Sequence, residues 1–259
     1  MGFKAVVFDW AGTVIDFGSF APMGAFVEAF AQFQVKVTID EARGPMGMAK
    51  RDHIETMLFA PRVAAEWEKV RGAAPTDADI DAIYQIFVPL NEEVVVKYAD
   101  LVPEGADTIA KLRAMGLKIG STTGYTRSIM ERVLPVAAKQ GYEPDNLVCS
   151  DDMAETRPGP LGMYQCFIDL GVYPPEAVIK VDDTEPGIAE GVSAGCLTVG
   201  VALSGNYVGK TPAELAAMSA DEIAPLRDHA AAKLKSAGAD HVIDTIADLP
   251  ALIEKISGG

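Results

Sequence analysis

Short apolar segments that alternate with helix-like segments constrain the fold of this chain more than any other feature of its sequence. Each apolar run has the length of a β-strand, and segments with helical spacing separate the later runs. This alternation is typical of α/β proteins and predicts a parallel sheet. The apolar runs cover residues 3–8, 117–121, 147–149, 178–181, 196–201 and 241–243, and a helix is expected over residues 249–256.

A long helical insertion interrupts this pattern after the first apolar run. Between residues 20 and 99 apolar residues recur at helical spacing, and no run has strand character. The α/β pattern resumes where Pro103 and Gly105 mark a turn, which we interpret as the hinge of a lid. The predicted domains are an α/β core of residues 1–18 and 100–259 and an inserted helical cap of residues 19–99.

Charge and composition exclude several classes of partner. The 259 residues include 37 acidic and 22 basic side chains, a net charge of -15, which argues against nucleic acid or an anionic membrane as the partner. The sequence has no basic leader and no apolar run long enough to span a membrane. Cys149, Cys166 and Cys196 are widely spaced and lie in apolar segments, so we expect reduced, buried thiols and a cytoplasmic protein.

A carboxylate stands directly after the first apolar run, in the sequence Asp9-Trp10-Ala11-Gly12-Thr13. Open α/β sheets bind ligands beyond the carboxyl ends of their strands, so Asp9 has a position suited to catalysis. Gly12 permits a tight turn there, and Thr13 adds a hydroxyl beside backbone N–H groups that can hold an anion. Taken alone, Asp9 could equally cap the element that follows it.

Three later segments supply the other groups that an Asp nucleophile needs at a phosphorus centre. Thr123 and Gly124 follow the second run and offer a hydroxyl and backbone donors ahead of a helix. Arg157 follows the third run and supplies a positive charge, while Asp182 and Asp183 follow the fourth and could bind a hard cation. Each segment could also be a turn, a surface charge or a helix cap, but their order favours a common site.

This order of motifs resembles the haloacid dehalogenase (HAD) superfamily of phosphotransferases, over nearly the whole chain. The resemblance implies a HAD-like Rossmannoid parallel-sheet core with an inserted α-helical cap, in which Asp9 attacks phosphorus while Thr123 and Arg157 hold the phosphoryl oxygens. It also implies an Mg²⁺ ion bound by Asp9, the main-chain carbonyl of Ala11 and Asp183. A metal and a cation are needed because a bare carboxylate is repelled by a dianionic phosphoryl group.

Ala11 departs from the pattern of the phosphatases in this superfamily. Those enzymes carry a second Asp two residues after the nucleophile, and this Asp protonates the departing alcohol oxygen, whereas this chain has Ala11 there. An oxygen leaving group would therefore lack its general acid. Either the protein is inactive, or its leaving group is stabilised by other means.

The insertion contains an amine that could stabilise the leaving group, within the segment from Gly44 to His53. A turn rich in Pro and Gly leads into a helix expected to begin near Met48, which places Lys50 close to a helix N-terminus and beside Arg51. Both features disfavour the protonated amine, so Lys50 could be a nucleophile toward a carbonyl. His53 shares the same helix face and could move protons. Considered alone, these residues would be a surface lysine and a core or capping histidine.

Lys50 and Ala11 explain each other if the bond that breaks joins carbon to phosphorus. A protonated lysine imine beta to phosphorus is an electron sink, so the leaving group becomes an enamine and needs no acid at oxygen. The matching blocks are residues 9–13, 46–53 and 121–126, together with Arg157. In these blocks the chain closely resembles the phosphonoacetaldehyde hydrolase family of the superfamily.

This closer resemblance implies hydrolysis of the C–P bond of phosphonoacetaldehyde to acetaldehyde and phosphate. It implies catalytic roles for Asp9, Lys50 and His53, with a Lys50 Schiff base and an Asp9 aspartyl-phosphate, and a homodimer formed through the cap. The residues implied to bind substrate are Ala11, Met46, Gly47, Thr123, Gly124, Tyr125 and Arg157.

Two positions differ from the pattern of some family members. Ser19 stands where some carry a Cys, and Gly187 stands where some carry a second acidic residue four places after the one matched by Asp183. Asp182 or water could complete the metal's ligands instead. Two other functions stay open: a HAD-type phosphomonoesterase or sugar-phosphate mutase in which Lys50 only binds substrate, and an inactive phospho-ligand binding protein.

Overall fold

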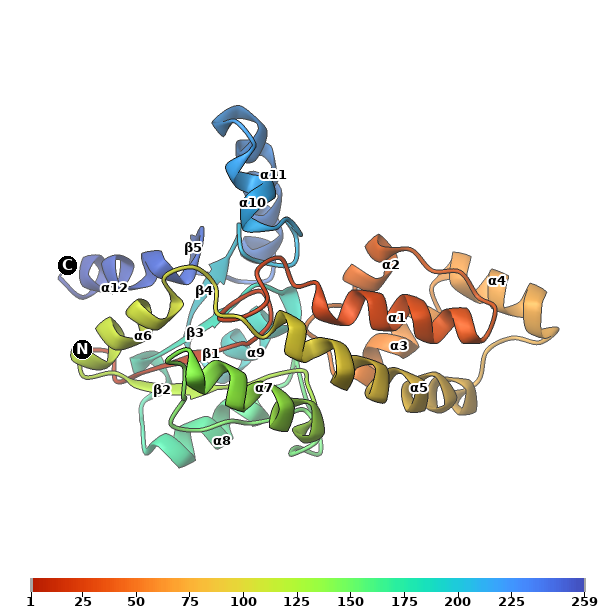
Figure 1. Ribbon diagram of the computed structural model, residues 1–259. Helices are drawn as coiled ribbons and strands as arrows, with labels where there is room; N and C mark the ends of the chain where they lie inside the picture. Colours follow the sequence, from red (N-terminus) through yellow and green to blue (C-terminus); the bar gives the residue numbers. More distant parts are fainter. Residues whose placement is uncertain (1, 259) are drawn as a thin grey trace.

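A five-stranded parallel sheet forms the centre of the protein, as a computed structural model that describes residues 2–258 shows (Figure 1). The strands are β1 Ala5–Phe8, β2 Lys118–Ser121, β3 Val178–Asp182, β4 Leu197–Val201 and β5 His241–Ile243. Their spatial order is β2-β1-β3-β4-β5, with Val6 of β1 paired to Ile119 on one side and Ile179 on the other. The predicted α/β fold with a parallel sheet is confirmed.

Two layers of helices cover the sheet. They comprise α6 Gly105–Ala114, α7 Arg127–Lys139, α8 Leu161–Leu170, α9 Glu185–Ala194, α12 Leu249–Ser257 and the end of α11 Ala220–Ser236 that packs on β4 and β5, with short 3-10 turns η2 Pro175–Ala177 and η3 Ile246–Asp248. The short helix α10 Pro212–Ala216 precedes α11 and buries no residue. Because side chains alternate along a strand, Val6 and Phe8 pack with α6, α7 and α12, whereas Ala5 and Val7 pack with α8 and α9. Burial on both faces explains the continuous apolar runs.

The helices between β1 and α6 form a separate lobe with its own apolar core (Figure 1). They are α1 Ala21–Gln32, α2 Ile39–Arg43, α3 Lys50–Leu58, α4 Pro61–Arg71 and α5 Asp77–Val95, followed by the 3-10 turn η1 Val96–Tyr98. The rings of Phe26 and Phe87 stack with centroids 4.2 Å apart at the centre of this lobe. Two connections join the lobe to the sheet and lie side by side, with Ile15 bridged to Leu101.

The prediction of a strand over residues 147–149 is wrong. In this segment Val148 forms a single bridge to Thr122 rather than a strand. The reason lies in the preceding side chains, because Asp145 Oδ2 accepts a hydrogen bond from the N–H of Ile119 (2.8 Å) and Asn146 Oδ1 accepts one from the N–H of Ser121 (3.3 Å). These side chains take the N–H groups of Ile119 and Ser121, so the neighbouring backbone donates to the carbonyl oxygens of these residues but forms no regular ladder with β2.

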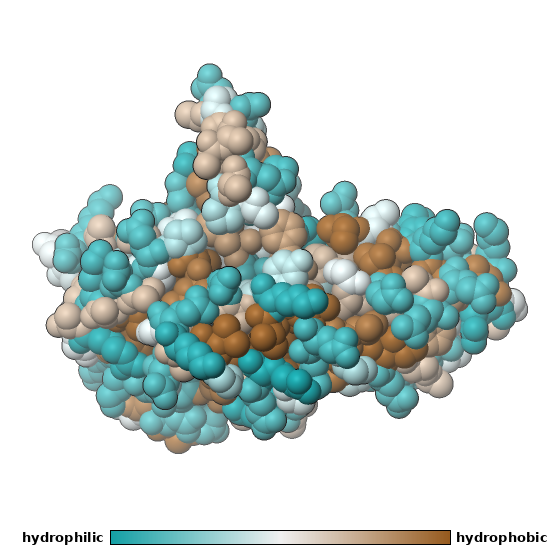
Figure 2. All heavy atoms as spheres, in the orientation of Figure 1, coloured by the Kyte–Doolittle hydropathy of each residue, from teal (hydrophilic) through white to brown (hydrophobic). Residues whose placement is uncertain are grey.

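The outer surface is mainly polar on the face shown in Figure 2, with apolar side chains gathered near the contact of α5 with α7. The helices α10 and α11 project from the sheet as an arm (Figure 1). None of the helices within residues 2–258 combines the length and the apolar character that crossing a bilayer requires.

Candidate active site

A small cavity lies where the carboxyl ends of β1, β2 and β3 face the helical lobe. Its lining residues are Asp9, Ala11, Met46, Gly47, Lys50, Thr123, Gly124, Tyr125, Arg157 and Thr184. This lining includes all the residues predicted to be catalytic or to bind substrate except His53, and it adds Thr184. The candidate metal ligands Asp182 and Asp183 and the hydroxyl of Thr13 do not line it. A larger groove beside it, lined in part by Met48 and Ala189, is apolar and contains none of the candidate catalytic side chains.

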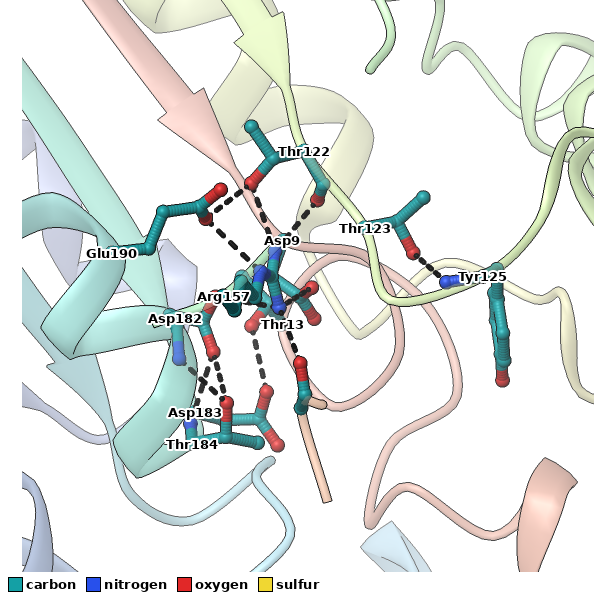
Figure 3. A network of polar contacts seen from close by, with 12 residues as sticks. Asp9, Thr13, Thr122, Thr123, Tyr125, Arg157, Asp182, Asp183, Thr184 and Glu190 are labelled. Atoms are coloured by element: carbon teal, nitrogen blue, oxygen red, sulfur yellow. Dashed lines mark hydrogen bonds and ion pairs between the residues drawn. The ribbon is translucent and has the colours of Figure 1, made fainter. Parts of the chain in front are cut away.

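Asp9 and Arg157 form a buried ion pair at the floor of the cavity (Figure 3). Nη1 of Arg157 lies 2.9 Å from Oδ1 of Asp9, and both side chains are more than nine-tenths buried. Burial and the neighbouring Asp182 raise the pKa of Asp9 to about 6, although Arg157 opposes this shift. The ion pair therefore keeps a buried carboxylate oriented at the end of β1.

Three buried carboxylates converge beside this ion pair. Oxygen atoms of Asp9, Asp182 and Asp183 lie within 4.8 Å of one another. Asp183 accepts hydrogen bonds from the Oγ1 of Thr13 (3.1 Å) and the N–H of Asn206 (2.7 Å), and burial and Asp9 raise its pKa well above the ordinary value. Such an excess of buried negative charge suits a hard cation, so these residues fit a metal site.

Asp182 differs from Asp183 because its charge is already balanced by protein groups. Its Oδ2 lies 3.1 Å from Nζ of Lys180 and 3.4 Å from Nη1 of Arg157. Its Oδ1 accepts hydrogen bonds from the N–H and Oγ1 of Thr184 at 3.0 and 2.7 Å. The geometry therefore favours Asp183 over Asp182 as the carboxylate available to a cation.

Lys50 is the first residue of α3 and its amine is buried in an apolar environment. Its Nζ lies 3.9 Å from Sδ of Met46 and 5.0 Å from the ring centroid of Tyr125. Burial lowers the pKa of this amine to about 8, with Arg157 acting in the same direction and Asp9 opposing it.

The sequence-based attribution of this shift to Arg51 is wrong. Nε of Arg51 lies 2.8 Å from Oδ1 of Asp81, and the Arg51 side chain is partly exposed. Neighbours in sequence at the start of a helix point in different directions. The cation that lowers the pKa of Lys50 is Arg157, which comes from the core rather than from the lobe.

His53 is buried in the lobe and does not line the cavity. Its Nε2–H donates to the carbonyl of Ala42 (2.7 Å), and its ring stacks on Phe26 with centroids 4.0 Å apart. Burial and the charge of Lys50 hold its pKa well below the ordinary value. The imidazole is therefore neutral at pH 7, and its Nδ1 has no hydrogen-bond partner within residues 2–258.

Two glycines let the lobe approach the sheet around the cavity. A Cβ on Gly47, whose φ is +92°, would lie 2.2 Å from Oγ1 of Thr184, and one on Gly124 would lie 2.7 Å from the carbonyl oxygen of Met48. Beside Gly124, Oγ1 of Thr123 accepts a hydrogen bond from the N–H of Tyr125 (3.1 Å). Backbone from the lobe and from the core thus meet directly at the site.

Sequence reasoning missed a group of polar residues behind the cavity: Thr122 and Glu190, which Figure 3 shows, and Lys180. One signal could have revealed Lys180, because it is a charged residue inside the apolar run of residues 178–181. A lysine in a strand that is buried on both faces must find a partner. Glu190 gives no comparable signal, since a glutamate in a helix is ordinarily solvated.

Comparisons with known proteins identify the family. A family model for haloacid dehalogenase-like hydrolases matches residues 3–195. A phosphonoacetaldehyde hydrolase of Paraburkholderia xenovorans is 53% identical over 98% of this chain and 95% of its own length. The chain belongs to the phosphonoacetaldehyde hydrolase family of the haloacid dehalogenase-like hydrolases. The family and fold class expected from the motifs are confirmed.

Further comparisons agree with this assignment. A phosphonoacetaldehyde hydrolase of Klebsiella pneumoniae is 51% identical, again over 98% of this chain and 95% of its own length. The crystal structure of a phosphonoacetaldehyde hydrolase-like protein from Oleispira antarctica is 41% identical and superposes with a TM-score of 0.97, covering 100% of this chain and 94% of that one. A hydrolase from Pseudomonas syringae, 16% identical with a TM-score of 0.72 over 98% of this chain and 99% of that one, shares the fold.

Proposed function

We propose that this protein hydrolyses the C–P bond of phosphonoacetaldehyde to acetaldehyde and phosphate, the reaction for which its relatives are named. The observation that carries the proposal is the shared lining of one buried cavity by the amine of Lys50 and the carboxylate of Asp9. An amine with a lowered pKa suits a carbonyl, and a carboxylate beside Arg157 suits phosphorus.

In the first step the free amine of Lys50 attacks the aldehyde carbon, and loss of water gives an imine. Protonation of the imine nitrogen turns the imine carbon, which lies two bonds from phosphorus, into an electron sink. His53 is the candidate proton acceptor in this step, because its ring is neutral and its Nδ1 has no hydrogen-bond partner within residues 2–258. The side chains of Met46 and Tyr125 exclude water around the new bond.

In the second step the carboxylate of Asp9 attacks phosphorus while the C–P bond breaks. The electron pair of that bond enters the protonated imine and forms an enamine, and the phosphoryl group becomes an aspartyl-phosphate on Asp9. Thr123 and Arg157 would hold the phosphoryl oxygens. Because no alkoxide leaves, the methyl side chain of Ala11 costs the reaction nothing.

Two hydrolyses complete the turnover. The enamine takes a proton on carbon and becomes the imine of acetaldehyde, and water then releases acetaldehyde and restores Lys50. A second water cleaves the aspartyl-phosphate, so that phosphate leaves and Asp9 is regenerated. Gly47 and Gly124 bring the lobe and the core close enough to enclose a small substrate between them.

The residues that would hold Mg²⁺ are Asp9, the main-chain carbonyl of Ala11 and Asp183. Support comes from the three converging carboxylates and from the absence of a cationic partner for Asp183 among residues 2–258. A bound divalent ion would offset the repulsion between the Asp9 carboxylate and a dianionic phosphoryl group.

The organisation of the protein follows from the same proposal. The separate core of the lobe supports a cap of residues 19–99 on a catalytic core of residues 1–18 and 100–259. Burial raises the pKa of Cys149, Cys166 and Cys196 to about 12, which suits thiols in the reducing cytoplasm. We also propose the homodimer through the cap that the family resemblance implies. Sedimentation velocity of the full chain measures its oligomeric state.

Trapping of the imine tests the function. Borohydride should inactivate the enzyme irreversibly in the presence of acetaldehyde, and peptide mapping should locate the reduced adduct on Lys50. Lys50→Arg should keep the positive charge but lose at least about 1,000-fold in phosphonate turnover, because a guanidinium stays protonated and cannot condense with an aldehyde.

The exposed Lys97 serves as the control, since Lys97→Arg should leave trapping and turnover unchanged. Full phosphonate hydrolysis by Lys50→Arg, or an adduct on Lys97 in place of Lys50, would contradict the mechanism. A phosphomonoesterase would then be the better assignment.

A further inference from the structure

The side chain of Arg157 is held by its own environment rather than by its backbone. Arg157 lies in an irregular segment of turns and bends between Val148 and α8, so no helix or strand fixes its position. Its guanidinium is nevertheless almost completely buried and bonded at every nitrogen. The groups that bind those nitrogens therefore determine where the positive charge points.

Two of the three guanidinium nitrogens are bound by groups behind the cavity (Figure 3). Nε lies 3.0 Å from Oε2 of Glu190, and Nη2 donates to the carbonyl oxygen and Oγ1 of Thr122 at 3.0 and 2.8 Å. Nη1 points to the cavity, 2.9 Å from Asp9. The planar fork of arginine is rigid, so fixing Nε and Nη2 also fixes Nη1.

The proton arrangement in this network requires an acceptor at Glu190. Oγ1 of Thr122 accepts from Arg157 and from Nζ of Lys180 (2.7 Å), so its single proton must go to Oε2 of Glu190, 2.8 Å away. Lys180 lies 3.0 Å from the same oxygen. Oε2 thus receives three donors, which an ionised carboxylate can accept and an amide cannot replace without loss.

The surrounding backbone leaves room for this group. A Cβ on Gly162 of α8 would lie 2.7 Å from Oε1 of Glu190, and one on Gly191 of α9 would lie 2.7 Å from Cβ of Lys180. The backbones of α8 and α9 are therefore in direct contact with the side chains of Glu190 and Lys180. A buried ion pair of this kind costs desolvation energy and adds little stability compared with apolar packing, so stability alone does not account for it.

We infer that Glu190 is a positioning residue that holds Arg157 so that Nη1 meets the phosphoryl group in the cavity. Lys180 neutralises Glu190 and, through Thr122, fixes the direction of the hydrogen bonds. Glu190 itself does not line the cavity with Asp9 and Lys50. The inference rests on the proposed function for the identity of the phosphoryl ligand.

Binding of inorganic phosphate to the Mg²⁺-loaded enzyme, measured by isothermal titration calorimetry, tests the inference. Glu190→Gln removes one negative charge near an anion site, so electrostatics alone would tighten phosphate binding. Loss of positioning should instead weaken it, about ten- to a hundred-fold, as expected for hydrogen bonds to a charged group. Glu190→Asp keeps the charge but shortens the reach, and it should weaken phosphate binding as well.

Two further readouts separate positioning from a general structural effect. The KM for phosphonoacetaldehyde should rise with the phosphate dissociation constant, whereas acetaldehyde-dependent trapping at Lys50 should stay within about two-fold of wild type. Adding Glu190→Asp to Arg157→Lys should cost no more than Arg157→Lys alone, because the anchored fork is already gone. The exposed Glu176→Gln variant is the matched control and should change none of these values.

Unchanged or tighter phosphate binding in Glu190→Gln and Glu190→Asp would overturn the inference, as would losses that multiply with Arg157→Lys. If Glu190→Gln does not fold, Glu190→Gln combined with Lys180→Met removes one charge of each sign, and retained phosphate affinity in that pair would overturn it too. Failure of the wild type to cleave phosphonoacetaldehyde would count against the proposed function only, because phosphate binding is measured without turnover.

Discussion

Lys50 shows how burial changes the chemistry of an ordinary side chain. With a pKa of about 8, about one lysine in ten is a free amine at pH 7, against about one in three thousand at the ordinary value of 10.5. Asp9 opposes the shift because its negative charge favours the ammonium, so burial beside Met46 and Tyr125 must outweigh it. The lowered pKa of this amine is thus a consequence of its burial.

The rate of trapping should follow this pKa. With acetaldehyde and cyanoborohydride in excess, labelling of Lys50 should rise about tenfold between pH 6 and 7 and level off above pH 8, since only the deprotonated amine condenses. Quantitative peptide mapping measures the label, and Lys97 provides an internal comparison in the same samples. Labelling of Lys50 that continues to rise tenfold per unit up to pH 10 would contradict the lowered pKa.

At the scale of elements, β3 packs closely against α9, and the side chain of Asp182 fills the space between them. A Cβ on Gly187 would lie 1.9 Å from Oδ2 of Asp182, so the carboxylate from β3 occupies the position next to the helix. Some family members place an acidic side chain at the position of Gly187, as the sequence resemblance indicated. In this chain the carboxylate of Asp182 fills that space, and Gly187 is the residue that leaves room for it.

Substitution of Gly187 tests whether the Asp182 carboxylate needs the space that this glycine leaves. Gly187→Ala should lower the free energy of unfolding by about 1 to 3 kcal/mol, because the neighbouring carboxylate is held by Thr184 and Lys180 and cannot move freely. Gly187→Asp should cost more, and Asp182→Gly in the same chain should recover at least half of that loss. Urea unfolding measures each value.

Gly24→Ala is the matched control, since a Cβ there meets nothing within 4 Å and Gly24 lies in α1. It should be neutral or stabilising by up to about 1 kcal/mol because alanine favours the helix. If Gly187→Ala is as stable as Gly24→Ala, the Asp182 carboxylate can move aside without a loss of unfolding free energy, and the prediction is wrong.

The same scale shows how far the sequence determines the fold. The runs that became β1, β3 and β4 were predictable because both faces of those strands are buried, which requires continuous apolar residues. No strand forms over residues 147–149 because the side chains of Asp145 and Asn146 accept hydrogen bonds from two N–H groups of β2. That competition between side chain and backbone arises only in three dimensions.

The candidate site also has a part that the sequence predicts and a part that it does not. Asp9, Thr123 and Asp183 could be grouped from sequence because parallel strands bring their carboxyl ends to one edge of the sheet. The partners of Arg157 could not, since Glu190 reaches it from a helix and Thr122 from the end of a strand. Sequence neighbours also misled, because Arg51 adjoins Lys50 in the chain but pairs with Asp81.

At the scale of the whole molecule, the candidate active site lies where the lobe meets the sheet. Lys50 belongs to the lobe and Asp9 to the core, and each part has its own apolar core. Arg43 of α2 strengthens the contact, since its Nη1 donates to the carbonyl of Gly18 (2.8 Å) and to Oδ1 of Asn206 (3.2 Å). Activity therefore depends on the closed arrangement more than folding does.

Gly124→Ala should separate closure from folding. The φ of Gly124 lies outside the left-handed region and permits alanine, but a Cβ would lie 2.7 Å from the Met48 carbonyl oxygen, which is backbone of the lobe and cannot rotate away. We expect an unfolding free energy within about 1 kcal/mol of wild type, because the lost contact joins two parts that pack independently. We expect kcat/KM to fall about 100-fold and trapping at Lys50 to slow, since small displacements of catalytic groups are costly. Small-angle scattering should report a larger radius of gyration for Gly124→Ala, which a merely crowded cavity would not produce. Gly24→Ala is again the control. A variant with the scattering of wild type and full activity would show that the lobe closes without this glycine.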